Sequence, residues 1–433
     1  MKLIRTGLIA IFAFAVFAFG AVEVWATSIV EIGAAILLLL WALVFFKNPG
    51  SKIVWNPLNY PLFGLLTLGA GQLLFHGTEY PFLTTVALLQ LSACFIVFFL
   101  CTQVFRERGD LIRLAWVLIA LCFVISLFGI IQHFTFDGKI YWLRKLTAGG
   151  ELFGPFINRN HFAGFVELTL PVGLCLIVFR GFRRDVVPLL TLTTVVPIGA
   201  LILSGSRGGI VALGFQLAVL VVLVRSRRST ESQRVTIVGI AALIALALVT
   251  WLGAGKVVER FSNLRASEVT LSRRASMVRG ATHMFAAYPI HGAGLGTLVS
   301  VYPKFETYYD GNVVDHVHND YIEILAEMGI LGGICGLTFL WILLRDAKTY
   351  FFAEQGHFSR ALHAGAVVAL AGILLHSFVD FNLHILSNLL LFLLMAHLAT
   401  SKPLPSESAL PRRQRIRASR HRTGDRQFDR MDA

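Results

Sequence analysis

The sequence predicts an all-α membrane protein with about twelve transmembrane helices. The first observation is composition, because 56% of the 433 residues are hydrophobic. The second is that apolar stretches of roughly 17–25 residues, long enough to cross a bilayer as a helix, recur along the chain. Together they exclude an ordinary soluble globule and a disordered chain. No alternating strand pattern competes with the apolar stretches, so we do not expect a β-barrel.

Each apolar stretch is interpreted as one span. The first follows Lys2 and Arg5 and could be a signal peptide, but so many spans follow it that we expect an uncleaved first helix. The expected spans lie near residues 7–21, 28–46, 58–76, 82–101, 112–132, 161–180, 186–203, 208–224, 235–252, 328–344, 361–378 and 384–399. The five cysteines fall inside these stretches and show no metal-ligand or disulfide spacing, so we interpret them as small core residues.

Positive charge orients the helices. When the N-terminus is placed in the cytoplasm, the cytoplasmic intervals collect most of the 38 Lys and Arg residues, as the positive-inside rule requires. This parity also places the C-terminus in the cytoplasm. A net charge of +13 would suggest nucleic acid in a soluble protein, but membrane sidedness explains it here, and no nucleic-acid partner is expected.

Two long intervals on the outer side divide the chain. We predict N-terminal transmembrane helices over 1–132, a first outer loop over 133–160, central helices over 161–252, a large outer loop over 253–320, C-terminal helices over 321–400 and a basic tail over 401–433. The large loop is rich in aromatic residues, so we expect it to fold over the outer mouth of the bundle. The tail is interpreted as a disordered cytoplasmic arm attracted to anionic lipids.

Arginines on the outer side are the first candidates for a site. Residues 204–209 read Ser-Gly-Ser-Arg-Gly-Gly and predict a tight outer turn that carries Arg207. Ser272 is a candidate cap for a helix bearing Arg274 and Arg279, with Arg265 upstream. A guanidinium group binds phosphate through two parallel hydrogen bonds, so these arginines predict a diphosphate clamp. The alternatives are a snorkelling arginine at the turn and a solvated basic helix.

Glycines after Pro289 offer a second possible anion site. His291-Gly-Ala-Gly-Leu-Gly296 could form a nest of amide groups for phosphate, but the favoured interpretation is a plain tight turn.

Two histidines mark the end of the large outer loop. His316 and His318 directly precede a helix start, where we expect Asp320 to be the N-cap and Glu323 to complete a capping box. Helical spacing places Asp320, Glu323 and Glu327 on one face. Paired imidazoles beside carboxylates predict acid–base chemistry. A metal site is the rival interpretation, but no third ligand follows at a familiar spacing, so no metal is expected.

The end of the first outer loop carries polar residues suited to sugars. Asn158 and Asn160 offer amides for sugar hydroxyls or for capping the next helix, and Arg159 adds an outward-facing cation. Glu167 follows within the membrane, where an acid is costly unless it faces the bundle interior.

Four segments in a fixed order resemble the O-antigen ligase and Wzy-type polymerase family of bacterial inner membranes. They are Phe156–Gly164, Ser206-Arg207-Gly208, Pro289 followed by Gly292-Ala293-Gly294, and His316–Tyr321. The resemblance covers roughly residues 154–332 and rests on their order together with the spans and the large outer loop.

The resemblance implies a GT-C-like membrane glycosyltransferase that needs no cofactor. Its donor would be a glycan on undecaprenyl diphosphate, and its acceptor a sugar hydroxyl on lipid A-core or on a second lipid-linked glycan. By position, His318 would be the base because it precedes Asn319, with His316 beside it and Asn319 close to the substrate. Arg207 and Arg274 would hold the diphosphate, with Arg265 and Arg279 as further contacts. The active site would then face the periplasm.

We hypothesise that Arg207 and Arg274 take the place of a metal ion in stabilising the leaving diphosphate, and that transfer inverts the anomeric centre. A transporter or flippase of lipid-linked glycans is the alternative from a different class. Such a protein would carry its charges along a midplane cavity and show repeated halves. Here the polar residues concentrate at the outer face instead.

Overall fold

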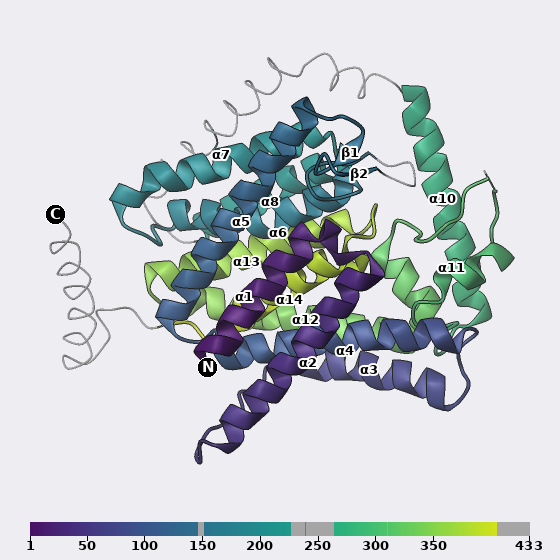
Figure 1. Cartoon of the computed structure of the whole chain (residues 1–433), viewed down its shortest axis with the longest axis horizontal. Helices are drawn as coiled ribbons and strands as arrows, with labels where there is room; N and C mark the ends of the chain where they lie inside the picture. The colour runs from purple at the N-terminus through teal and green to yellow at the C-terminus, as the bar shows by residue number, and fades with distance from the viewer. Residues whose placement is uncertain (146–150, 227–238, 240–263, 310, 405–433) are drawn as a thin grey trace.

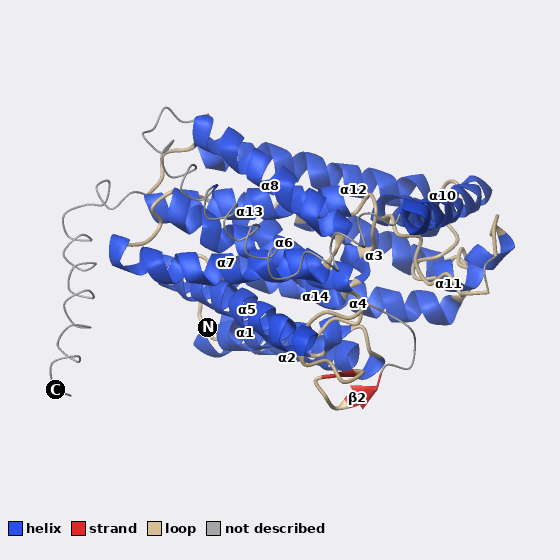
Figure 2. Ribbon diagram, turned by 90° about the horizontal axis from the view of Figure 1, so that it is seen from above, coloured by secondary structure: helices blue, strands red, loops and turns tan. Residues whose placement is uncertain are grey.

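The computed structural model describes residues 1–145, 151–226, 239, 264–309 and 311–404. For residues 264–271 it describes the backbone alone. Within the described residues the fold is almost entirely helical (Figures 1 and 2). The one sheet in this part of the chain is a short antiparallel hairpin of β1 (Lys139–Ile140) and β2 (Arg144–Lys145). The predicted all-α polytopic class is therefore confirmed.

The helices follow the predicted order. They are α1 (Lys2–Phe17), α2 (Val24–Phe46), α3 (Asn59–Leu74), α4 (Pro81–Val104), α5 (Arg108–Phe134), α6 (Arg159–Val178), α7 (Val187–Ser204), α8 (Arg207–Arg225), α10 (Leu264–Ala287), α11 (Leu298–Val301), α12 (Asp320–Phe352), α13 (His357–His376) and α14 (Leu386–Thr400). Short 3-10 turns η1 (Phe19–Ala21), η2 (Arg184–Val186), η3 (Tyr302–Lys304) and η4 (Asn382–His384) connect some of them.

Eight of the described helices are long and apolar enough to cross a membrane. The shorter helices α1, α3 and α14 coincide with three further expected spans. Apart from residue 239, the expected span at 235–252 lies outside the described residues, and so does the predicted tail beyond residue 404.

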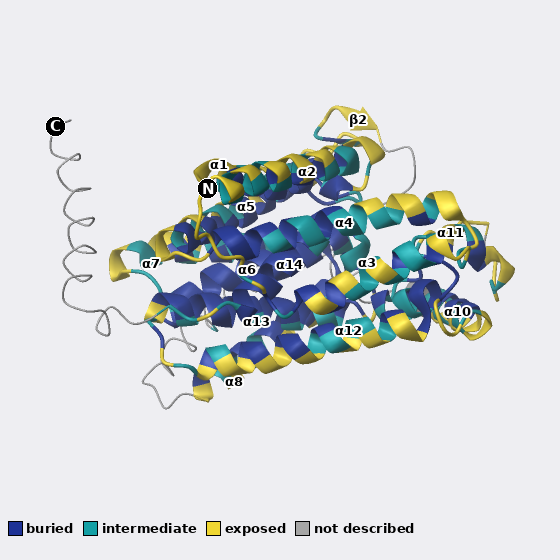
Figure 3. Cartoon of the chain, turned by 90° about the horizontal axis from the view of Figure 1, so that it is seen from below, coloured by how far each residue is buried: buried dark blue, intermediate teal, exposed yellow. Residues whose placement is uncertain are grey.

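Helices α6 and α14 occupy the centre of the bundle (Figure 3). In the most apolar 18-residue stretch of α6, 94% is buried inside the protein, whereas only 22% of the corresponding stretch of α2 is buried. An apolar helix that keeps most of its surface exposed is suited to face lipid. Helix α13 approaches α6 at Gly365, where an added Cβ atom would lie 3.0 Å from the Val172 Cα atom, so a small residue permits the close crossing.

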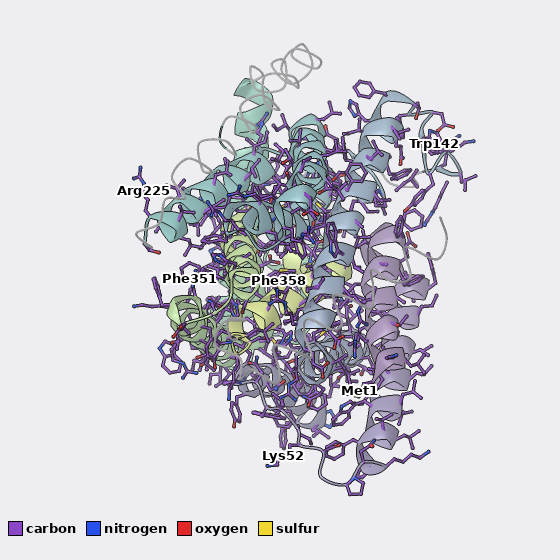
Figure 4. All side chains as sticks on the ribbon, turned by 90° about the vertical axis from the view of Figure 1, so that its left-hand side faces the viewer. Met1, Lys52, Trp142, Arg225, Phe351 and Phe358 are labelled. Atoms are coloured by element: carbon purple, nitrogen blue, oxygen red, sulfur yellow. The ribbon has the colours of Figure 1, made fainter. Side chains whose placement is uncertain are left out.

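Helices α1 and α8 lie on opposite flanks of this centre. Figure 4 shows Met1 and Arg225 on either side of the bundle, with side chains filling the space between the helices. Helix α1 packs against α2 and α14, and its Leu8 and Ala15 are fully buried.

The large outer loop has a small apolar core of its own. Met284, Leu298, Val301, Tyr302 and Val317 are buried in it. Helices α10 and α11 lie together at one end of the bundle, and α10 packs against α12 (Figure 1). The expectation that this loop folds is therefore confirmed for its described part. The helix α10 extends upstream of Ser272, so Ser272 is not its cap.

Helix α12 changes direction at Gly329, where its polar start becomes an apolar span. Gly329 has φ +62°, and Ile330 N and Leu331 N donate to Pro289 O and Ile290 O at 2.8 and 3.2 Å. A Cβ atom at Gly329 would lie 2.3 Å from Ile290 O, so glycine is required. At this break, carbonyl groups of the loop accept hydrogen bonds from amide groups of α12, so the loop lies directly against the helix.

Candidate active site

The buried carboxylate of Asp380 joins four separate parts of the chain. Asp380 lies between α13 and η4 and has no exposed surface. Its Oδ2 atom accepts from Asn160 Nδ2 at 2.5 Å and lies 3.5 Å from an Arg274 amino group. Its Oδ1 atom accepts from Phe381 N at 2.9 Å and lies 3.4 Å from His318 Nδ1. The start of α6, helix α10 and the loop before α12 therefore converge on one carboxylate.

This environment keeps Asp380 ionised. Burial alone would raise the pKa of Asp380, but the close contact and charge of His318, with the charges of His376 and His161, lower it well below the ordinary value. Arg274 contributes a further positive group at 3.5 Å. A buried carboxylate with this many partners is a fixed negative charge against which neighbouring side chains can be oriented.

His318 is held in an unusual backbone conformation beside Asp380. Its φ angle is +53°, a region that a non-glycine residue rarely occupies. Val317 is completely buried in the loop core, and its N–H donates to Glu323 Oε2 at 3.1 Å. Such strain persists only when surrounding contacts determine it, and it concentrates at functional sites. Because Nδ1 faces Asp380 and 23% of the side chain is exposed, Nε2 is the ring nitrogen left for a substrate.

The aromatic ring of Phe381 arranges three imidazoles. His318 and His161 meet it edge-on, with ring centroids 4.9 and 4.7 Å away, and His316 stacks on it at 4.4 Å. Phe381 therefore packs against all three imidazole rings and fixes their positions relative to one another, because aromatic rings favour these edge and stacked contacts.

The start of α8 is connected to the same carboxylate through hydrogen bonds. Ser206 Oγ donates to Asn160 Oδ1 at 2.8 Å, while Asn160 donates to Asp380. Ser206 is also the N-cap of α8, where Oγ accepts from Gly209 N at 3.2 Å. Gly205 (φ +67°) makes the predicted tight turn. Arg207 is thus the first, exposed residue of a helix whose cap belongs to the Asp380 network.

The remaining predicted arginines are less closely associated with Asp380. Arg279 is exposed five residues after Arg274, about 140° further around α10, and therefore points elsewhere. Arg265 belongs to α10, but its side chain lies outside the described residues. Arg274 and His318 both contact Asp380. Ser206, the residue before Arg207, is connected to the same carboxylate through Asn160.

His316 belongs to a second cluster with the acidic start of α12. His316 Nδ1 lies 2.5 Å from Glu323 Oε1, and His384 Nε2 lies 3.2 Å from the same oxygen. His384 Nδ1 lies 2.7 Å from Asp320 Oδ1. Burial disfavours a charged His384, but Glu323 and Asp320 overcome this and raise the pKa of His384 to about 10. His384 is thus the third potential ligand that local spacing did not reveal.

Several predicted substrate contacts have structural partners. Asn158 is the N-cap of α6 and accepts from Asn160 N at 2.9 Å. Arg159 pairs with Glu151. Asn319 accepts from Tyr321 N and Ile322 N and donates to Phe378 O at 3.0 Å. Asn160 is the member of this group that contacts Asp380.

One expectation about α12 was wrong, and the glycine segment does not offer its amides to phosphate. Asn319, not Asp320, is the N-cap of α12, so Asp320 and Glu323 do not form the expected capping box. The three acidic residues do share a face, but that face is buried. The nest after Gly292 holds Glu327, whose oxygens accept from Gly296 N and Leu298 N, each at 2.9 Å. An internal carboxylate therefore occupies the amides that we considered for phosphate.

Sequence reasoning missed the segment that joins α13 to α14. In the sequence, Asp380 and Phe381 lie just after the expected span at 361–378, and His384 lies at the start of the next one. The signal was topological, because the alternation of spans places this short connection on the same side of the membrane as the large outer loop. Glu167 was correctly expected to face inward, and it pairs with the buried His376 at 2.8 Å.

Comparison with known proteins supports the resemblance. Residues 192–337 match the model of a family described as O-antigen ligase. The chain is also 25% identical over 341 residues to the teichuronic acid biosynthesis protein TuaE of Bacillus subtilis strain 168, a match covering 73% of this chain. The matched region spans 64% of that relative's length. The family match includes Arg207, Arg274 and His318, but it ends before Asp380.

The chain is therefore similar in sequence to an O-antigen ligase family and to a teichuronic acid biosynthesis protein, and its described residues include eight helices long and apolar enough to cross a membrane.

Proposed function

We propose that this chain, a member of the O-antigen ligase family, transfers a glycan from undecaprenyl diphosphate to an acceptor sugar hydroxyl at the outer face of the bacterial inner membrane. The observation that carries the proposal is the shared contact of His318 and Arg274 with Asp380. This contact places a candidate base beside a group able to bind diphosphate. No cofactor takes part in this proposal.

His318 serves as the general base. Its Nδ1 atom faces the Asp380 carboxylate, which stabilises the imidazolium that forms when Nε2 accepts the acceptor's proton. The deprotonating hydroxyl oxygen attacks the anomeric carbon, and a new glycosidic C–O bond forms as the bond to the diphosphate oxygen breaks. Attack opposite the leaving group inverts the anomeric centre.

Arg207 and Arg274 stabilise the leaving group. Negative charge develops on the diphosphate as its bond breaks, and guanidinium groups placed in advance stabilise that charge without reorganisation. Arg274 is 26% exposed while its position is fixed by Asp380, so it can contact both the buried anchor and a ligand. Arg207 approaches from the start of α8, and Arg265 and Arg279 would hold outer parts of the donor.

The remaining polar residues act around these groups. Asn160 positions Asp380 and the α8 cap, whereas Asn158 and Asn319 cap the starts of α6 and α12. Arg159 pairs with Glu151, and we assign Asn158, Arg159 and Asn319 to contacts with the sugars. The proposed acceptor is either lipid A-core, as in a ligase, or a second lipid-linked glycan, as in a polymerase. In both cases the proposed chemistry is identical, and the acceptor alone differs.

The test is transfer by purified protein in lipid vesicles that contain a glycan on undecaprenyl diphosphate and each of the two acceptors. We expect the wild-type protein to form new glycosidic bonds and His318→Ala to lose at least about 10²-fold in rate, because general-base help is typically worth 10²–10⁴-fold.

The matched control is His283→Ala, which removes an exposed imidazole on α10 in the same outer region. It should retain the wild-type rate. Near-normal transfer by correctly folded His318→Ala would remove His318 from the proposed role. Movement of the donor across the membrane without new bonds would instead indicate a flippase.

A further inference from the structure

The second histidine cluster has the composition of a metal site. His316, Glu323 and His384 each present one potential ligand atom, and these three atoms lie within 4.8 Å of one another. They come from the end of the large outer loop, the first turn of α12 and η4, respectively. Two imidazoles and one carboxylate are a ligand set that suits Zn²⁺ and similar first-row cations, whereas Mg²⁺ and Ca²⁺ prefer oxygen ligands alone.

The separations agree with such an ion after small side-chain adjustments. A tetrahedral Zn²⁺ with bonds of about 2.0–2.1 Å separates its ligand atoms by about 3.3 Å. Glu323 Oε1 lies 3.2 Å from His384 Nε2 and 2.5 Å from His316 Nδ1. Rotation of the half-buried His316 ring would open the shorter of the two separations without moving a helix.

Independent support comes from the atoms behind the cluster. Asp320 Oδ1 lies 2.7 Å from His384 Nδ1, which leaves Nε2 directed at Glu323. Without metal, Nε2 holds a proton toward Glu323, and a bound cation takes the place of that proton, which is released to solvent. A carboxylate that orients a histidine in this way is the usual second partner of a metal-bound imidazole. Asp320 Oδ2 accepts from Leu383 N at 3.3 Å and so fixes the carboxylate in turn.

Access and neighbouring groups also favour an ion. The His316 and His384 side chains are each 28% exposed, whereas Glu323 is 1% exposed, so the cluster has a buried anchor and an open side. Glu327 does not compete for the ion, because both of its oxygens accept backbone N–H groups.

We propose that His316, Glu323 and His384 bind one first-row divalent cation of the Zn²⁺ type, with Asp320 orienting His384. The ion would tie the loop that carries His318 to α12 and η4, and it does not contact the reacting atoms. His316 and His318 pack on two sides of Phe381, so fixing His316 also fixes the approach of His318. The inference does not rest on glycosyl transfer, because metal binding is measured directly.

The experiment uses the full-length protein purified in detergent and stripped with a chelator. The protein is equilibrated with Zn²⁺, separated from excess metal and analysed for zinc per chain, and Co²⁺ is then titrated while its visible absorption reports four-coordinate geometry. We expect one equivalent of zinc in the wild-type protein and in the His283→Ala control, and loss of this equivalent in His384→Gln. Asp320→Asn should bind about 10–100-fold more weakly, as expected for loss of an orienting partner.

Two outcomes would overturn the proposal. One is a folded wild-type protein that retains no zinc. The other is retention that both His384→Gln and His316→Gln leave unchanged, which would place the ion elsewhere. Circular dichroism and gel filtration of each variant distinguish lost ligands from lost fold. If His384→Gln does not fold, loss of zinc from folded His316→Gln provides the same test.

Discussion

At the scale of single residues, the two oxygens of Asp380 have different tasks. Oδ1 faces His318 and accepts from the Phe381 amide, while Oδ2 faces Asn160 and Arg274. One carboxylate therefore contacts both the candidate base, His318, and the candidate anion-binding group, Arg274. Burial raises the pKa of Asp380, but His318 and the neighbouring histidines lower it overall, which favours the ionised carboxylate.

Asp380→Asn, which keeps a side chain of nearly the same size, should decrease the rate of glycan transfer. The neutral amide no longer stabilises the imidazolium of His318, so we expect a loss within the range of about 10²–10⁴-fold that a general base contributes. The effect should fall mainly on kcat, since Asp380 is buried away from substrate, and initial rates at varied acceptor concentration measure this. Asp185→Asn, at an exposed surface pair, is the control. A variant with full kcat and wild-type thermal stability would contradict the assignment.

At the scale of elements, helix starts and connections build the site. Ser206 precedes α8, Asn158 precedes α6 and Asn319 precedes α12, each capping its helix through a side-chain oxygen. Such caps typically contribute about 0.5–2 kcal/mol each, so polar residues at these positions stabilise the helices as well as shaping the site. The positive end of the α8 dipole also favours an anion beside Arg207.

Arg207→Lys tests the geometry at the α8 start. Lysine keeps the positive charge but loses the planar pair of donors that matches phosphate oxygens. Removing one such donor group typically costs about 10²–10³-fold, so we expect Arg207→Ala to reach this range and Arg207→Lys to lose less. Transfer rates of both variants at saturating donor measure the effect.

The control is Arg183→Lys, which alters an exposed arginine paired with Asp185. Equal activity of Arg207→Lys, Arg207→Ala and the wild-type protein would exclude Arg207 from leaving-group stabilisation.

At the scale of the whole molecule, α10 and α11 lie together at one end of the bundle (Figure 1), which is the polar end because Arg274 belongs to α10 and His318 to the loop before α12. The apolar flanks of α2 and α12 expose large side chains such as Leu39 and Trp341, as expected for surfaces facing lipid. We predict that this polar end faces the periplasm and that both chain ends are cytoplasmic.

Cysteine labelling tests this orientation. In spheroplasts, a membrane-impermeant maleimide should modify Val313→Cys, at an exposed position in the outer loop, without permeabilisation. Lys348→Cys, near the far end of α12, should react only after permeabilisation. The unsubstituted protein is the control, because four native cysteines are buried and Cys335 is half-buried. The reverse pattern would invert the topology.

Much of the fold followed from sequence, because span length and the side preference of Lys and Arg are local properties that a bilayer imposes on any chain. The same applies to the turn at Gly205 and to the candidates His318, Arg207 and Arg274, which occur in recognisable local segments. Only the tertiary structure revealed that Asp380 joins His318 to Arg274 and that His384 completes a cluster with His316 and Glu323. Contacts between residues so distant in the chain depend on how helices pack and on the break at Gly329, and no local spacing encodes them.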